Sequence, residues 1–118
     1  MTIEQRSSGG VTILDVRGKM TIEALGDLVL AERVRSVLEE GRMRILLNLE
    51  AVSYVDTIGL CNLVEAYLTA RRQGGALKLL RLTPHVRELL AVTRLLTVFE
   101  ACDSEADAVA SFDPAMSA

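Results

Sequence analysis

Residues 45–60, ILLNLEAVSYVDTIGL, decide the fold because they lead from a buried strand into a helix. The run from Ile45 to Leu49 is almost continuously apolar, which is typical of a central strand covered on both faces. Residues 50–57 are expected to form a connection. The helix that follows has an apolar stripe and a polar side. The stripe comprises Leu60, Leu63, Val64, Tyr67 and Leu68, and the polar side comprises Asn62, Glu65, Thr69 and Arg72.

Upstream of this unit, the sequence predicts two strands and a helix. Val11–Arg17 alternates apolar and polar residues over most of its length, which indicates a strand. Residues 2–6 are expected to pair with it as an edge strand after a turn at residues 7–10. The next helix ends at Gly41, which suits the left-handed C-cap, and its start is open because Gly26 disfavours an early beginning. Its apolar stripe is Leu30, Val34, Val37 and Leu38.

Downstream, the pattern predicts two more strands and two more helices. Residues 76–82 are mostly apolar and predict a strand. Thr83 followed by a proline marks a helix start, with threonine as N-cap and proline at the first helical position. Residues 97–101 form a candidate short strand. Ser104, with an aspartate three residues later, resembles a capping box that opens a last helix through Phe112.

These elements predict an α/β fold in the order β-β-α-β-α-β-α-β-α. Strands that alternate with helices favour a mostly parallel central sheet, here of four to five strands, with right-handed crossovers. We expect four helices packed mainly on one side of this sheet. A single domain is expected over residues 1–118, with its core at about 3–112 and a loose C-terminal tail at 113–118.

The composition narrows the class of protein. Half of the residues are hydrophobic but only 3% are aromatic, so the core must be aliphatic. The net charge of −3 argues against a dedicated nucleic-acid binder, which would normally carry a basic face. Residues 1–6 do not resemble a signal peptide, and no apolar run approaches the roughly 20 residues that span a bilayer. We therefore expect a cytoplasmic protein without membrane insertion.

The sequence supplies few groups for catalysis. His85 is the only histidine, and we expect a surface or helix-start role for it. Cys61 and Cys102 stand alone, without the spacing of a metal site, and are expected to be reduced and buried thiols. No phosphate-binding glycine motif is present. The sequence therefore predicts a protein that is not an enzyme and has no metal site or cofactor.

Asp56 and Thr57 stand where the functional edge of a parallel sheet is expected, between the end of a strand and the next helix. A hydroxyl there lies near free backbone N–H groups and the positive end of the helix dipole, so it can accept a phosphate without burying it. A phosphothreonine adds roughly −1.5 to −2 charges. A simpler interpretation is that Asp56 or Thr57 is only an N-cap and that Gly59 lets the helix pack closely.

With these residues in view, the sequence resembles the STAS family and, within it, the bacterial anti-anti-sigma factors, over about residues 3–112. The hallmark of that family is an Asp-Ser/Thr-x-Gly-Leu stretch at the start of the second helix. The matching residues are Asp56, Thr57, Gly59 and Leu60, and further likeness lies at residues 18–20, 45–49 and 74–75.

The resemblance implies a phosphorylation switch. It implies that the unmodified protein binds an anti-sigma factor that is also a kinase of the histidine-kinase-like ATPase fold, which releases a sigma factor. Phosphorylation at Thr57 would weaken the complex, and a serine/threonine phosphatase would reset it. Asp56 would orient the hydroxyl or contact the partner, Gly59 would allow close approach, and Ile58 would add an apolar contact. Thr21 occupies a position that is often aspartate in the family.

Two alternatives stay within reach of the sequence. Some STAS proteins are accessory subunits of lipid ABC transporters or parts of stress-sensing complexes, and Thr57 would then be an unmodified contact residue. The same helix start could instead serve a small regulatory module that binds a nucleotide or another anion.

Overall fold

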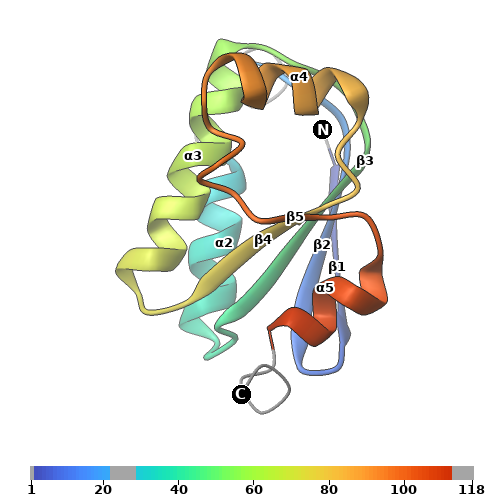
Figure 1. The fold of residues 1–118 in the computed structure, drawn as a ribbon. Coiled ribbons are helices and arrows are strands. Elements are labelled where there is room, and N and C mark those ends of the chain that lie inside the picture. The colour runs from blue at the N-terminus through green and yellow to red at the C-terminus, as the bar shows by residue number, and fades with distance from the viewer. Residues whose placement is uncertain (1, 22–28, 113–118) are drawn as a thin grey trace.

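The structure, a computed structural model, describes residues 2–21 and 29–112. Five strands form one sheet in the order β1-β2-β3-β4-β5. β1 pairs antiparallel with β2, and the other neighbours are parallel, which confirms the mostly parallel sheet (Figure 1). The strands are β1 (Thr2–Ser8), β2 (Val11–Met20), β3 (Arg44–Val55), β4 (Ala76–Leu80) and β5 (Ala101–Cys102).

The helices cover the two faces of the sheet unequally, as Figure 1 shows. Buried side chains of α2, α3 and α4 share one core cluster with the sheet, whereas α5 joins a smaller cluster on the opposite face. The prediction of four helices mainly on one side is confirmed. Their bounds are α2 (Val29–Glu39), α3 (Thr57–Arg72), α4 (Pro84–Val92) and α5 (Glu105–Ser111).

The central strands bury both of their faces, as the apolar run at Ile45–Leu49 predicts. In β3, Ile45, Leu47 and Leu49 belong to the larger cluster, and Leu46 between them belongs to the cluster under α5. Alternation along a strand places successive side chains on opposite faces, so one short run contributes to two layers. Each such side chain stabilises the fold by roughly 1.5–3 kcal/mol relative to an exposed position.

The predicted bounds of all five strands are wrong at one end or more. β1 runs on to Ser8, so residues 7–8 are strand rather than turn, and β2 runs on to Met20 rather than ending at Arg17. β3 runs on to Val55, so residues 50–55 are strand rather than connection, with Val52 and Val55 buried and Ser53 and Tyr54 exposed. β5 is only Ala101–Cys102, because residues 95–99 form turns in which the Val98 and Phe99 amides bond to the Leu95 carbonyl. β4 ends at Leu80, before Arg81 adopts a positive φ of 52°. The open start of the helix before Leu30 and the predicted tail at 113–118 lie outside the described residues.

The polar side predicted for α3 is partly buried. Asn62 and Thr69 are closed off from solvent because α3 packs against α2 as well as against the sheet. The Asn62 side-chain oxygen accepts a hydrogen bond of 3.3 Å from the Ala31 amide, near the described start of α2, and Thr69 donates to the Glu65 carbonyl. The buried side of α3 therefore includes two polar side chains, Asn62 and Thr69, that are hydrogen-bonded.

Both predicted downstream caps are confirmed. The Thr83 hydroxyl accepts from the Val86 amide at 3.2 Å, with Pro84 at the first helical position, and the Ser104 hydroxyl accepts from the Asp107 amide at 3.4 Å. Each cap satisfies an amide that the helix itself leaves unpaired. No helix in the described residues is long and apolar enough to cross a membrane.

Candidate functional site

Asp56, rather than Thr57, caps α3. Its backbone is extended, and its side-chain oxygen accepts a hydrogen bond of 2.8 Å from the Gly59 amide. Thr57 is the first residue of the helix and is exposed. Within the described residues its hydroxyl makes no hydrogen bond. The capping role and the hydroxyl are therefore on different residues, and the hydroxyl is accessible.

Gly59 fits α3 directly against the end of β2. It is buried, and a Cβ at this position would overlap the carbonyl oxygen of Met20. The same Met20 oxygen accepts a hydrogen bond from the Asp56 amide at 3.2 Å. Thr21, half-buried, follows Met20 and so lies at the same junction. This supports the packing interpretation of Gly59, and contact of a partner with its backbone stays a prediction.

Two exposed apolar side chains flank the Asp56–Thr57 pair. Tyr54 is 48% exposed and Ile58 is 41% exposed, although side chains of this size are usually buried in larger part. The Tyr54 ring stacks on the ring of His85, the second residue of α4, with centroids 5.1 Å apart. His85 is exposed, as predicted, but the sequence gives no indication that its ring meets Tyr54, since residues 50–57 are not expected to be strand.

The cysteine predictions are wrong in one respect. Both thiols are free, as expected, but Cys61 is exposed and Cys102 is only half-buried. Cys61 lies four residues after Thr57 in α3, so the two side chains share one side of the helix. Among the described residues, no group of three or more His, Cys, Asp or Glu side chains could hold a metal ion.

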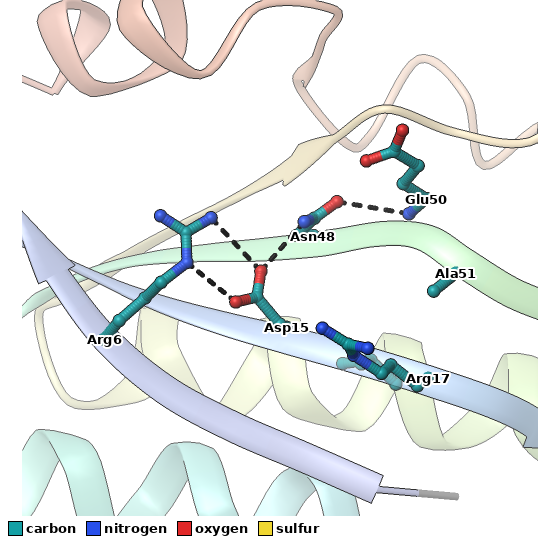
Figure 2. Close-up of a pocket in the computed structure, with 7 residues that line it drawn as sticks. Arg6, Asp15, Arg17, Asn48, Glu50 and Ala51 are labelled. Atoms are coloured by element: carbon teal, nitrogen blue, oxygen red, sulfur yellow. Dashed lines mark hydrogen bonds and ion pairs between the residues drawn. The ribbon is translucent and has the colours of Figure 1, made fainter.

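Apart from the residues around Thr57, a polar pocket lies on the face of the sheet that carries α5. Figure 2 shows Asp15 of β2 at its centre, where it receives hydrogen bonds from Arg6 and Asn48. The Arg6 Nε to Asp15 Oδ2 distance is 2.7 Å, and the Asn48 Nδ2 to Asp15 Oδ1 distance is 2.8 Å. Arg6 also reaches Glu105 at the start of α5, at 2.6 Å. The remaining lining residues are Val16, Arg17, Glu50 and Ala51.

At the centre of this pocket, Arg6 compensates the charges of Asp15 and of the neighbouring Glu105. The hydrogen bond from Arg6, then that from Asn48, lowers the pKa of the Asp15 carboxyl despite its partial burial. Arg6 lowers the pKa of Glu105 in the same way, and the two acids raise the pKa of the Arg6 guanidinium. The carboxylate of Asp15 is held ionised and bonded, so this cluster ties β1, β2, β3 and α5 together rather than acting as an acid or base.

The sequence contains an indication of this pocket that the sequence analysis above does not use, namely two polar residues within apolar strands. Asp15 and Asn48 interrupt two apolar runs, and they are partners in the parallel register of β2 and β3. Two polar residues at one register position of adjacent buried strands must bond to something, because an unpaired buried polar group is costly.

The fold defines the class as an α/β protein with a mostly parallel sheet, in which the exposed Tyr54 and Thr57 lie at or just after the carboxyl end of β3. The chain belongs to the STAS domain family, which residues 2–108 match. It is 30% identical over 79 residues to BtrV of Bordetella bronchiseptica, which is named as an anti-sigma factor antagonist; the match covers 67% of this chain and 68% of BtrV.

Solved structures share the fold at low sequence identity. A Thermotoga maritima protein named as an anti-sigma factor antagonist superposes with a TM-score of 0.81 at 22% identity, over 92% of each chain. The Bacillus cell fate determinant SpoIIAA, in its phosphorylated form, gives a TM-score of 0.69 at 15% identity, over 95% of this chain and 100% of SpoIIAA.

Proposed function

We propose that this protein is a cytoplasmic anti-sigma factor antagonist whose binding is switched off by phosphorylation of Thr57. The unmodified protein binds an anti-sigma factor that is also a kinase of the histidine-kinase-like ATPase fold, and the sigma factor is released. A serine/threonine phosphatase restores the unmodified state. The observation that carries the proposal is the exposed Thr57 hydroxyl, which the cap formed by Asp56 leaves without a structural task.

The chemistry of the switch needs only what the kinase brings. The Thr57 oxygen forms a bond to the γ-phosphorus of ATP, the bond between that phosphorus and the ADP oxygen breaks, and the hydroxyl proton passes to a base of the kinase. The phosphothreonine then carries roughly −1.5 to −2 charges. It stands beside the Asp56 carboxylate, so negative charge gathers at one point of the edge.

Two physical effects make this charge weaken binding. A partner surface that accepts Ile58 must exclude water around it, and a phosphate one residue away resists desolvation. A partner surface with acidic side chains is repelled directly. Thr21, Asp56 and Gly59 lie at the junction of β2 and α3, and Ile58 is exposed beside them. These four are the proposed contact residues, and Asp56 also fixes the backbone that presents the hydroxyl.

The names of similar proteins support this proposal. BtrV and the Thermotoga protein are named as anti-sigma factor antagonists, and SpoIIAA has a structure in a phosphorylated form. An anion-binding module gains less support, because the Asp56 carboxylate already occupies the start of α3, where an anion would otherwise bind.

The test is phosphoryl transfer in a purified system. Each histidine-kinase-like anti-sigma factor of the source genome is incubated with this protein and ATP, and phosphopeptides are located by mass spectrometry. We expect one kinase to modify Thr57 alone, to modify Thr57→Ser at the same position, and to leave Thr57→Ala unlabelled. Full labelling of Thr57→Ala would contradict the proposal, as would a complete absence of labelling with every kinase.

A second measurement tests the consequence for binding. Isothermal titration of that kinase with unmodified and phosphorylated protein should show a large loss of affinity on phosphorylation, and Thr57→Glu should show part of this loss. Equal affinities for the unmodified and phosphorylated forms would contradict the electrostatic account.

A further inference from the structure

The outer side of α4 forms a hollow that the fold leaves open. It is lined by His85, Glu88, Leu89 and Val92, which we call the α4 hollow. His85 lies three residues before Glu88 and four before Leu89, and Val92 lies four residues after Glu88 and three after Leu89, so the four residues share one side of the helix. The opposite stripe, with Val86 and Leu90, is buried in the core. Leu89 packs in part against the core, whereas Glu88 and Val92 are exposed, so the hollow lies on the solvent side of a helix that the core already holds.

The α4 hollow combines an apolar surface with an uncompensated charge. Val92 is 75% exposed, the highest value among the large exposed hydrophobic residues of the described chain. Within the described residues, the Glu88 carboxylate takes part in no ion pair or hydrogen bond, whereas the neighbouring Arg87 pairs with Asp103. An exposed apolar side chain beside an unpaired carboxylate is complementary to an apolar side chain that stands next to a lysine or arginine.

The α4 hollow is continuous with the edge around Thr57. His85 forms one wall of the hollow and stacks on Tyr54 at 5.1 Å. Tyr54 precedes Thr57 by three residues, a length of chain that spans at most about 10 Å. A partner that covers Thr57 and extends by about 10 Å can therefore reach Tyr54 and, through the stacked His85, the hollow.

The Thr57 segment is too small to hold a partner alone. A specific protein interface buries about 800 Å² on each partner. Of the residues 56–59, Gly59 is buried and Asp56 is half-buried, so only two side chains there offer full contact. The adjoining exposed apolar surface is that of Tyr54, His85 and the hollow.

We infer that the α4 hollow is a second docking point for the kinase, which inserts an apolar side chain against Leu89 and Val92 and pairs a lysine or arginine with Glu88. This inference rests on the proposed function. The hollow lies away from the hydroxyl that reacts, so it contributes to affinity and to the choice of kinase, and not to the transfer step. Its contribution should appear in KM and not in kcat.

The test uses the purified kinase that labels wild-type Thr57. Val92→Glu places a charge in the apolar part of the hollow, and Glu88→Lys reverses the charge at its rim. We expect each change to raise KM for this protein about tenfold, as expected of a residue near the energetic centre of an interface, while kcat stays within about twofold. Circular dichroism and thermal unfolding confirm that the variants are folded, since both side chains point outward.

Matched controls sit at the opposite edge of the sheet. Met43→Glu introduces the same charge at another exposed apolar residue, just before β3, and Glu39→Lys reverses an exposed charge at the end of α2. Both should leave KM unchanged. Because these positions lie at the amino ends of the strands, they are far from Thr57.

The outcomes separate the inference from the proposed function. If wild-type protein is labelled and Val92→Glu and Glu88→Lys have the KM of the controls, the inference is overturned and the proposed function stands. A fall in kcat at constant KM also overturns it. A wild-type dimer that Val92→Glu dissociates in light scattering would assign the hollow to a second copy instead. If no kinase labels the wild-type protein, both the proposed function and the docking role of the α4 hollow are contradicted.

Discussion

Two regions of this protein carry polar side chains at the ends or faces of β2 and β3, the pocket around Asp15 and the edge around Thr57. In the pocket, carboxylate, amide and guanidinium groups bond to one another. At the edge, Asp56 bonds to its own helix, and Thr57, Ile58 and Tyr54 face solvent. Charge density alone would have pointed to the pocket, but its central groups, Arg6, Asp15 and Asn48, already bond to one another.

The difference follows from where each region lies on the strands. The pocket sits on a sheet face, where Asp15 must be compensated within the fold because its side chain is only 14% exposed. The edge lies beyond the end of β3, where solvent satisfies a hydroxyl at little cost. Side chains that make no contact needed for folding are the ones available to a partner. This difference between the pocket and the edge can be tested by mutation.

The largest expected effect on stability lies at the edge, where Gly59→Ala should destabilise the fold. The added Cβ overlaps a backbone oxygen, that of Met20, which cannot move without shifting the end of β2. We expect a loss of about 3 kcal/mol in the free energy of unfolding, the upper range for overpacking, measured by urea denaturation. Cys61→Ala, at an exposed position in the same helix, is the control. An unchanged midpoint for Gly59→Ala would show that α3 does not pack against β2 so tightly.

Asp15→Ala should have the next largest effect. It leaves the Asn48 amide and one side of Arg6 without their partner in a half-buried site, which should cost about 2 kcal/mol. The same change at Glu105, which is 29% exposed, should cost under about 1 kcal/mol. Equal losses at the two acids would contradict the view that Asp15 is the centre of the cluster.

Acid should weaken the pocket. Arg6 holds the pKa of Asp15 and of Glu105 below the ordinary values of 3.8 and 4.5. Groups with a lowered pKa stabilise the folded state above their unfolded pKa, and this contribution is lost as pH falls through the folded pKa. The free energy of unfolding should therefore decline below about pH 5. Asp15→Asn should make this decline shallower in urea titrations at several pH values, and an unaltered slope would contradict the assignment.

The fold was largely predictable because its signals are local or periodic. The apolar run at Ile45–Leu49, the stripe of α3 and the Thr83 cap each depend on spacings along the chain. The full length of β3 was not predicted, because Ser53 and Tyr54 stand side by side between the buried Val52 and Val55. This spacing of three lacks the period-two alternation that marks a strand.

The candidate sites were predictable only in part, for a different physical reason. Asp56 and Thr57 are contiguous, so their place at a helix start is written in the sequence. The Tyr54–His85 stack and the contact of Arg6 with Glu105 join residues that are far apart in the chain. Such contacts depend on strand register and helix orientation, which one sequence specifies only through the packing of the whole domain.

Thr57→Ala should have the smallest effect on stability, and it gives the sharpest test of the difference between the pocket and the edge. The side chain is exposed and makes no hydrogen bond within the described residues, so the free energy of unfolding should change by less than about 0.5 kcal/mol. The same substitution should abolish phosphoryl transfer from the cognate kinase. Denaturation and labelling measured on one preparation would then contrast the two residues. Thr57 would be needed for modification and not for folding, and Asp15 for folding and not for modification. A Thr57→Ala protein that unfolds as easily as Asp15→Ala would mean that the hydroxyl has a structural task, and the edge would then be no freer than the pocket.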